Sequence, residues 1–138
     1  MKQELIIFPV IALAALTFGV GIWLGILRFR TVKSGDVKPS YYKLNRGAKI
    51  PEYLLKVNNN YNNLLEIPVL FYIVSLLIYV TNNTDWLFLL LSWLFVVTRY
   101  IHSYIHTTYN NVIHRKNIFL LGVAILIFEW ISLAFELI

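Results

Sequence analysis

The stretch LLEIPVLFYIVSLLIYV, residues 64–80, is apolar from end to end apart from one acid, Glu66. Outward from it, the chain contains three more apolar segments, at about 5–27, 86–105 and 118–138. A helix needs about 20 mainly apolar residues to cross a bilayer. The first and last segments reach that length outright, and the middle two reach it when each helix extends through its polar inner end.

These segments predict an all-α fold, an integral membrane four-helix bundle in which residues 1–138 form a single membrane domain. The predicted spans are about 5–27, 58–80, 86–106 and 118–138. Hydrophobic residues make up 59% of the chain and charged residues 14%, whereas a soluble domain is about 45–50% apolar and about 25% charged. This composition excludes a disordered chain, a coiled coil and an ordinary water-soluble globule.

The charge and the missing cysteine narrow the possible partners. The chain has no cysteine, which excludes a disulfide framework, a thiolate metal site and a cysteine nucleophile. Its formal net charge is +5 at pH 7. In so apolar a chain, this excess favours an anionic membrane surface or an anionic ligand, and not nucleic acid, as the partner.

The connections between spans differ in charge. Residues 28–56 hold eight lysines and arginines against two acids, and residues 106–117 hold Arg115 and Lys116. In a four-span protein these two connections lie on the same side, and the positive-inside rule places that side in the cytoplasm. Both termini are then predicted on the opposite side.

Polar residues inside the spans form two stripes. Ionisable groups in a membrane are costly and usually face the interior of a bundle. Spacings of i, i+4, i+7 and of i, i+3, i+7 each place three residues on one side of a helix. The stripes are Asn59, Asn63 and Glu66 in the second span, and Arg99, His102 and His106 in the third.

Glu66 and Arg99 are both predicted to lie roughly 12 Å from the cytoplasmic end of their helices, so that they face each other. One interpretation is a structural ion pair that fixes helix register. The other is a binding site, because asparagine, arginine and histidine donors suit an anionic, carboxylate-bearing ligand. The histidines are also candidate metal ligands, but H-E-x-x-H is absent and Arg99 competes for the carboxylate, so no metal site is predicted.

Other polar residues have less specific interpretations. Tyr109 and Arg115 lie at the predicted cytoplasmic mouth, where tyrosine is either an interfacial anchor or part of a site. Pro68 removes a backbone donor and is predicted to kink its helix. Glu129, deep in the last span, has no partner that the sequence identifies.

Two motifs resemble a known family. NLLEIPVLFY, residues 63–72, resembles the second-helix signature of the MAPEG family, the membrane-associated proteins in eicosanoid and glutathione metabolism. In particular, it resembles the bacterial branch that carries N-x-x-E-x-P-V-L-F-Y. RYIHSYIHTTYN, residues 99–110, followed by Arg115, resembles the third helix of that branch and the turn after it.

The resemblance implies a homotrimer of four-helix subunits that binds glutathione between neighbouring subunits near the cytoplasmic face. It implies a multi-pass protein of the inner membrane of a bacterium, with both termini outside the cytoplasm, surrounded by membrane lipids. By the same resemblance, Arg115 is the catalytic residue that stabilises the thiolate. The implied glutathione-binding residues are Asn59, Asn63, Glu66, Arg99, His102, His106 and Tyr109.

One position departs from the family pattern. Glutathione-using members usually carry an arginine two turns before the glutamate, and here that residue is Asn59, with Lys56 about one turn earlier. The leading interpretation is a glutathione-dependent transferase or peroxidase acting on lipophilic electrophiles. The alternative is a non-catalytic membrane protein of the same fold that binds a lipid or a protein partner. A small transporter or channel is a weaker third interpretation, because the sequence shows no discontinuous-helix pattern.

Overall fold

The computed structural model describes residues 1–44 and 49–138. Most of the described residues are helical, with no strand among them, and Arg46 of the basic connection lies outside them. The elements are η1 (Gln3–Ile6), α1 (Ile7–Lys33), η2 (Pro39–Lys43), α2 (Glu52–Leu64), α3 (Pro68–Val80), α4 (Trp86–Thr107) and α5 (Val112–Glu136).

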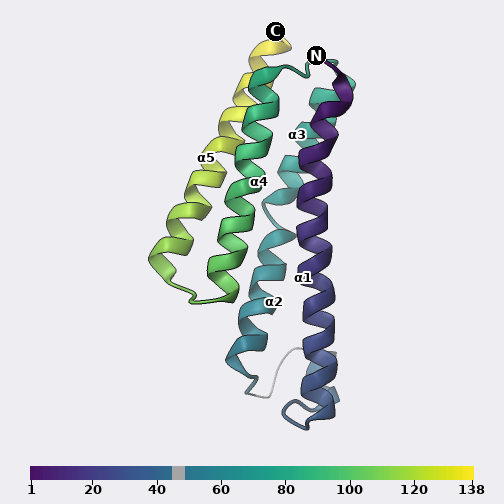
Figure 1. The fold of residues 1–138 in the computed structure, drawn as a ribbon, viewed down its shortest axis with the longest axis vertical. Coiled ribbons are helices and arrows are strands. Elements are labelled where there is room, and N and C mark those ends of the chain that lie inside the picture. Colours follow the sequence, from purple (N-terminus) through teal and green to yellow (C-terminus); the bar gives the residue numbers. More distant parts are fainter. Residues whose placement is uncertain (45–48) are drawn as a thin grey trace.

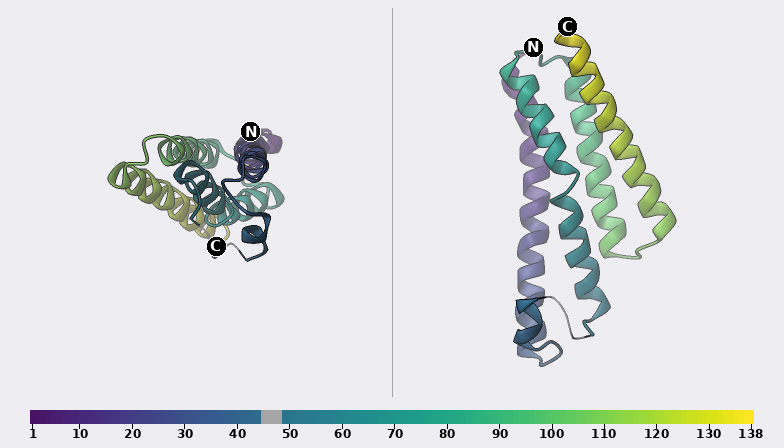
Figure 2. Two further views of the ribbon diagram at one scale, coloured as in Figure 1. Left: turned by 90° about the horizontal axis from the view of Figure 1, so that it is seen from below. Right: turned by 180° about the vertical axis from the view of Figure 1, so that it is seen from behind.

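Four helical segments are long and apolar enough to cross a membrane, which confirms the predicted fold class. They are Gln3–Lys33, Glu52–Val80, Trp86–Thr107 and Val112–Glu136. Both termini lie at one end of the elongated bundle, here called the terminal end (Figure 1). The α1–α2 and α4–α5 connections lie at the other, here called the basic end. There α1 and α2 extend past the α4–α5 turn (Figures 1 and 2).

Short polar side chains end and connect the helices. Asp85 caps α4 by accepting a hydrogen bond from the Phe88 amide (2.9 Å), and Asn111 caps α5 by accepting from the amides of Ile113 and His114. At the terminal end, Gln3 donates to the Asn82 carbonyl and accepts from the Thr84 amide. These bonds join the N-terminus to the α3–α4 turn.

The second span is broken and not merely kinked. α2 ends at Leu64 and α3 begins at Pro68, which has no amide hydrogen and a φ suited to the first position of a helix. Across the break, Leu65 and Glu66 donate to carbonyls three residues earlier, at Asn62 and Asn63. The prediction that the spans contain no discontinuous helix is therefore wrong for this span.

Two apolar clusters hold the helices together. One joins all the spans in the terminal half of the bundle, through side chains such as Leu13, Phe71, Phe95 and Leu126. The other joins α1 and α2 in the basic half; its buried members are Val20, Leu24, Val37, Leu54, Val57 and Leu64. α4 packs most extensively against α5, and this interface positions the candidate site.

Candidate functional site

The polar stripe of α4 faces α5 and is buried. Arg99 is only 2% exposed, and its Nη2 donates to the backbone carbonyl of Phe119 at 3.1 Å. Its guanidinium carbon lies 5.0 Å from the ring centroid of Phe95 and 5.1 Å from that of Phe119. Two aromatic faces and one carbonyl therefore hold this cation, and cation–π contacts stabilise it there.

A glycine makes room for Arg99. A Cβ built on Gly122 of α5 would overlap Arg99 Nη2 and Thr98 Oγ1. The close approach of the two helices at this level therefore requires glycine. Gly122 was not predicted as a site residue, although a lone glycine within an otherwise bulky apolar span is the signal that could have identified it.

Arg115 lies at the start of α5, at the basic end of the same interface. Its Nη1 donates to Asn110 Oδ1 at 2.6 Å and lies 3.4 Å from His106 Nε2. Asn110, in the turn between α4 and α5, adopts the left-handed conformation with φ 49°, and its amide donates to the Ile105 carbonyl. The α4–α5 turn thus fixes the guanidinium of Arg115 beside His106.

A cavity of about 340 Å³ opens beside these groups. It lies among α2, α4 and α5, and its lining residues are Asn63, His106, Val112, Arg115, Lys116 and Phe119. No acidic side chain lines it. Arg99 and His102 are buried behind it on α4, with the His102 ring 5.7 Å from that of His106 and 5.7 Å from that of Phe119.

Several buried nitrogens near this cavity have no hydrogen-bond partner within the described chain: Arg99 Nε, both ring nitrogens of His102 and His106 Nδ1. A guanidinium can only donate, so His106 Nε2 accepts from Arg115 and the ring proton is assigned to Nδ1. Arg99 Nε and His106 Nδ1 are then both unpartnered donors. Buried donors without acceptors cost about 1–3 kcal/mol each, so the arrangement suits a ligand rich in acceptor oxygens.

Glu66 does not pair with Arg99 within the chain, so the predicted ion pair is wrong there. Glu66 is exposed at the α2–α3 break, whereas Arg99 turns to α5. The only salt bridge within residues 1–44 and 49–138 joins Lys56 to Glu52 at 2.9 Å. The physical reason is the face that α2 presents: Asn60, not the predicted stripe, points at α4 and donates to Ser103 Oγ at 2.6 Å.

The sequence model of the MAPEG family matches residues 6–135, nearly the whole chain. The chain belongs to the MAPEG family. It is therefore an integral, multi-pass membrane protein in a lipid environment, from a family that includes both glutathione-dependent enzymes and non-catalytic members. Comparisons with curated proteins and with solved structures give no match.

The predicted site residues of this MAPEG protein separate into two groups. Those in or directly behind the cavity are Asn63, Arg99, His102, His106 and Arg115. Asn59 and Glu66 are exposed on the surface of the chain, and Tyr109 lies 3.2 Å from His114 Nδ1 through its hydroxyl and does not line the cavity.

Two further features bear on ligand chemistry. Lys56 is bound to Glu52 and donates to the Thr108 carbonyl at 3.4 Å, so it is not directed into the cavity in place of the arginine missing at Asn59. Within the described residues, no third histidine, aspartate or glutamate joins His102 and His106 to form a group that could hold a metal ion.

Proposed function

We propose that this MAPEG protein binds glutathione in the cavity among α2, α4 and α5 and uses its thiol against lipophilic electrophiles, as a transferase or peroxidase. The observation that carries the proposal is a cavity with three cations in or behind it, Arg99, Arg115 and Lys116, and no lining carboxylate. Glutathione supplies two carboxylates and a nucleophilic sulfur. The carboxylates match the hydrogen-bond donors and would neutralise the cations, which no lining carboxylate of the chain does.

Residues at different depths of the cavity have different roles in this proposal. Arg99, buried and held between two rings, supplies a fixed positive charge for a ligand carboxylate. Arg115, at the mouth of the cavity, favours the deprotonated thiol electrostatically. In the transferase reaction the sulfur forms a bond to the electrophilic carbon, and that carbon's leaving group departs with the bonding electrons.

The proposal includes a homotrimer, with the site shared between subunits. Glu66 is an exposed carboxylate at a break within a membrane span, and facing lipid would be costly for it. Asn59 is exposed on the same helix stripe. A neighbouring copy that covers this surface would bring Glu66 and Asn59 to the glutathione of the adjacent cavity.

Isothermal titration of glutathione into the detergent-solubilised protein tests the site. We expect binding below millimolar concentrations, weakened at least about tenfold by Arg99→Gln, because a charge-assisted hydrogen bond is lost. Lys33→Gln removes the same charge from an exposed position of α1 and is the matched control. S-methylglutathione, which keeps both carboxylates, should also bind but support no turnover.

Failure to bind glutathione contradicts the proposal and favours the alternative, a non-catalytic protein of the same fold. Equal loss of affinity in Arg99→Gln and Lys33→Gln would show that only general charge matters and that the cavity is not the site. Light scattering of the same samples measures the number of copies per particle, and a single copy would contradict the trimer.

A further inference from the structure

The α4–α5 turn, which holds Arg115, is also bonded to α2. α4 ends at Thr107 with Thr108 as its C-cap, and the last carbonyls of a helix have no partner within that helix. Lys56 Nζ of α2 donates to the Thr108 carbonyl at 3.4 Å. An ammonium group is favoured at this position both by the hydrogen bond and by the negative end of the α4 dipole. Lys56 therefore caps α4 from a neighbouring span.

The Lys56 side chain is held in this position. Only 22% of it is exposed, and its Nζ lies 2.9 Å from Glu52 Oε1, one turn earlier on α2. The Glu52 side chain is 79% exposed, and an ion pair with so exposed a partner adds little stability. The contribution of Glu52 is to restrict the conformations of Lys56, whose ammonium group is then available to the turn.

A second polar contact lies on the same face of α2. Asn60 follows Lys56 by four residues, a spacing that places both side chains on one side of a helix. Asn60 is fully buried and donates through Nδ2 to Ser103 Oγ of α4 at 2.6 Å. Lys56 and Asn60 together therefore dock α2 onto the C-terminal end of α4.

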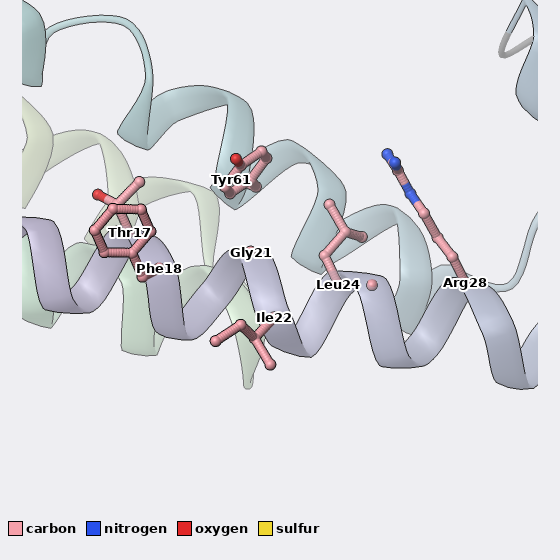
Figure 3. A pocket seen from close by; sticks show the side chains of 8 residues that line it. Thr17, Phe18, Gly21, Ile22, Leu24, Arg28 and Tyr61 are labelled. Atoms are coloured by element: carbon pink, nitrogen blue, oxygen red, sulfur yellow. The ribbon is translucent and has the colours of Figure 1, made fainter.

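On another face, α2 is fixed to α1. Tyr61 of α2 lies over Gly21 of α1 (Figure 3), and a Cβ on Gly21 would be 3.0 Å from the Tyr61 ring. Nearer the basic end, Arg28 Nη2 of α1 donates to Asn58 Oδ1 of α2 at 2.6 Å. Because α2 is packed on α1 in this way, it is a fixed support from which Lys56 reaches the turn.

We propose that Lys56 is a positioning residue of the glutathione site, which anchors the α4–α5 turn to α2 and thereby keeps Arg115 at the cavity. The proposal rests on the function proposed above. The contacts are continuous: Lys56 bonds to Thr108, and Asn110, two residues later, accepts from Arg115 Nη1 at 2.6 Å. The same Nη1 lies 3.4 Å from His106 Nε2, which lines the cavity. Lys56 does not touch the ligand and acts through Arg115.

Hydrogen exchange of the detergent-solubilised protein, followed by mass spectrometry, tests the anchor without any ligand. The amides of Thr108 and Asn110 donate to carbonyls of α4, so peptides that cover the turn report its opening. Lys56→Met keeps the apolar stem and removes the ammonium group. We expect exchange in the turn to become about threefold to tenfold faster, the effect of one lost hydrogen bond.

Two further variants are compared in the same experiment. Lys56→Arg keeps the charge and the N–H donors and should leave the exchange rate within about twofold of the unchanged protein. Lys43→Met is the matched control, because it removes the same charge from an exposed position of η2. It should leave exchange in the α4–α5 turn unchanged.

The bound thiol tests the consequence for Arg115. In Lys56→Met, the thiolate absorbance of bound glutathione and kcat should both fall about threefold to tenfold, while the affinity for glutathione changes less than about twofold. Lys56→Arg should restore the thiolate absorbance. Asn110→Gly already releases Arg115, so adding Lys56→Met to it should lower the thiolate fraction no further.

Unchanged exchange in the turn of Lys56→Met overturns the proposal, whether or not glutathione binds. A loss of affinity with unchanged kcat would show that Lys56 binds the ligand directly, and an additive effect with Asn110→Gly would show that it does not act through Arg115. An equal effect of Glu52→Gln would assign the role to the ion pair within α2. If the unchanged protein binds no glutathione, the proposed function fails, and the anchoring role of Lys56 is then decided by the exchange result alone.

Discussion

Arg99 is the residue around which the α4–α5 interface is organised. Its guanidinium occupies the space that a side chain at position 122 would need, and the rings of Phe95 and Phe119 lie against it. An arginine in a membrane span is costly unless it is partnered or faces a polar interior. Here two aromatic faces and one carbonyl provide part of that partnership, and Arg99 Nε is a buried donor without a partner within the described residues.

The first prediction concerns Gly122. Gly122→Ala places a methyl group on Arg99 and Thr98, so we expect a loss of stability of about 1–3 kcal/mol, the usual cost of overpacking. Gly19→Ala adds the same methyl group in open space and should be neutral or slightly stabilising, because alanine favours the helix. Unfolding in detergent compares the two, and equal midpoints would contradict the close approach at Gly122.

Glu129 of α5 is a further buried ionisable residue at the α4–α5 interface. It is 0% exposed, and its Oε1 accepts a hydrogen bond from Ser92 Oγ at 2.6 Å. Its Oε2 has no partner within the described chain. Ser92 is therefore the partner that the sequence analysis did not find for Glu129.

The second prediction compares two buried serines, Ser92 and Ser75, that differ in whether the hydroxyl has a hydrogen-bond partner within the described residues. Ser92→Ala leaves the Glu129 carboxyl without its donor and should cost about 1–3 kcal/mol. Ser75 is buried equally well, but its hydroxyl has no hydrogen-bond partner among residues 1–44 and 49–138, so Ser75→Ala should leave stability unchanged or raise it. The measurement is again unfolding in detergent. A larger loss at Ser75 than at Ser92 would refute the hydrogen bond to Glu129.

Among the elements, the α4–α5 turn connects backbone conformation to the site. Asn110 has two roles in this turn: its backbone adopts φ 49°, and its side-chain oxygen accepts a hydrogen bond from Arg115. Asparagine adopts this left-handed conformation more readily than most residues. The two roles can be separated, because glycine keeps the first and loses the second.

The third prediction separates those roles. Asn110→Gly should retain most of the stability, whereas Asn110→Ala should lose about 1–2 kcal/mol to backbone strain. Both variants release the Arg115 guanidinium and should lower turnover with glutathione to a similar extent, with a smaller effect on affinity. Steady-state kinetics and unfolding are measured side by side. Full activity in the glycine variant would show that Asn110 acts through the backbone alone.

The sequence predicts the elements better than it predicts their rotation. Long apolar runs indicated four spans, and the i, i+3, i+7 spacing on α4 predicted the stripe that the structure buries. On α2 the same reasoning failed, because asparagines at 58–60, 62 and 63 put polar groups on every face of the helix. Hydrophobic periodicity then could not distinguish Asn60, which contacts Ser103, from the exposed stripe. The break at 65–67 also changes the direction of the Glu66 side chain, so its position differs from the one that an unbroken helix predicts.

At the scale of the whole molecule, the single chain has one buried and one half-buried cation at the α4–α5 interface and an exposed carboxylate on its second span. Arg99 and Arg115 lie at the α4–α5 interface, and Glu66 and Asn59 are exposed on the second span. A symmetric assembly can bring the cations and the carboxylate together, because each subunit can present its polar α2 surface to the cavity of the next. This is why we propose that the neighbouring subunit completes the glutathione site in the cavity of each chain.

The fourth prediction is the orientation of the bundle in the membrane. Both termini lie at one end and the lysines and arginines of residues 28–43 lie toward the other (Figure 1), so the positive-inside rule places the basic end in the cytoplasm. The chain has no native cysteine, so Ser40→Cys and Lys2→Cys each introduce one exposed thiol, at opposite ends. In intact cells a membrane-impermeant maleimide should label the thiol at position 2 and reach position 40 only after lysis. Labelling of position 40 alone in intact cells would invert the topology. It would also place the proposed glutathione site on the side of the membrane away from the cytoplasm, where the supply of reduced thiol differs.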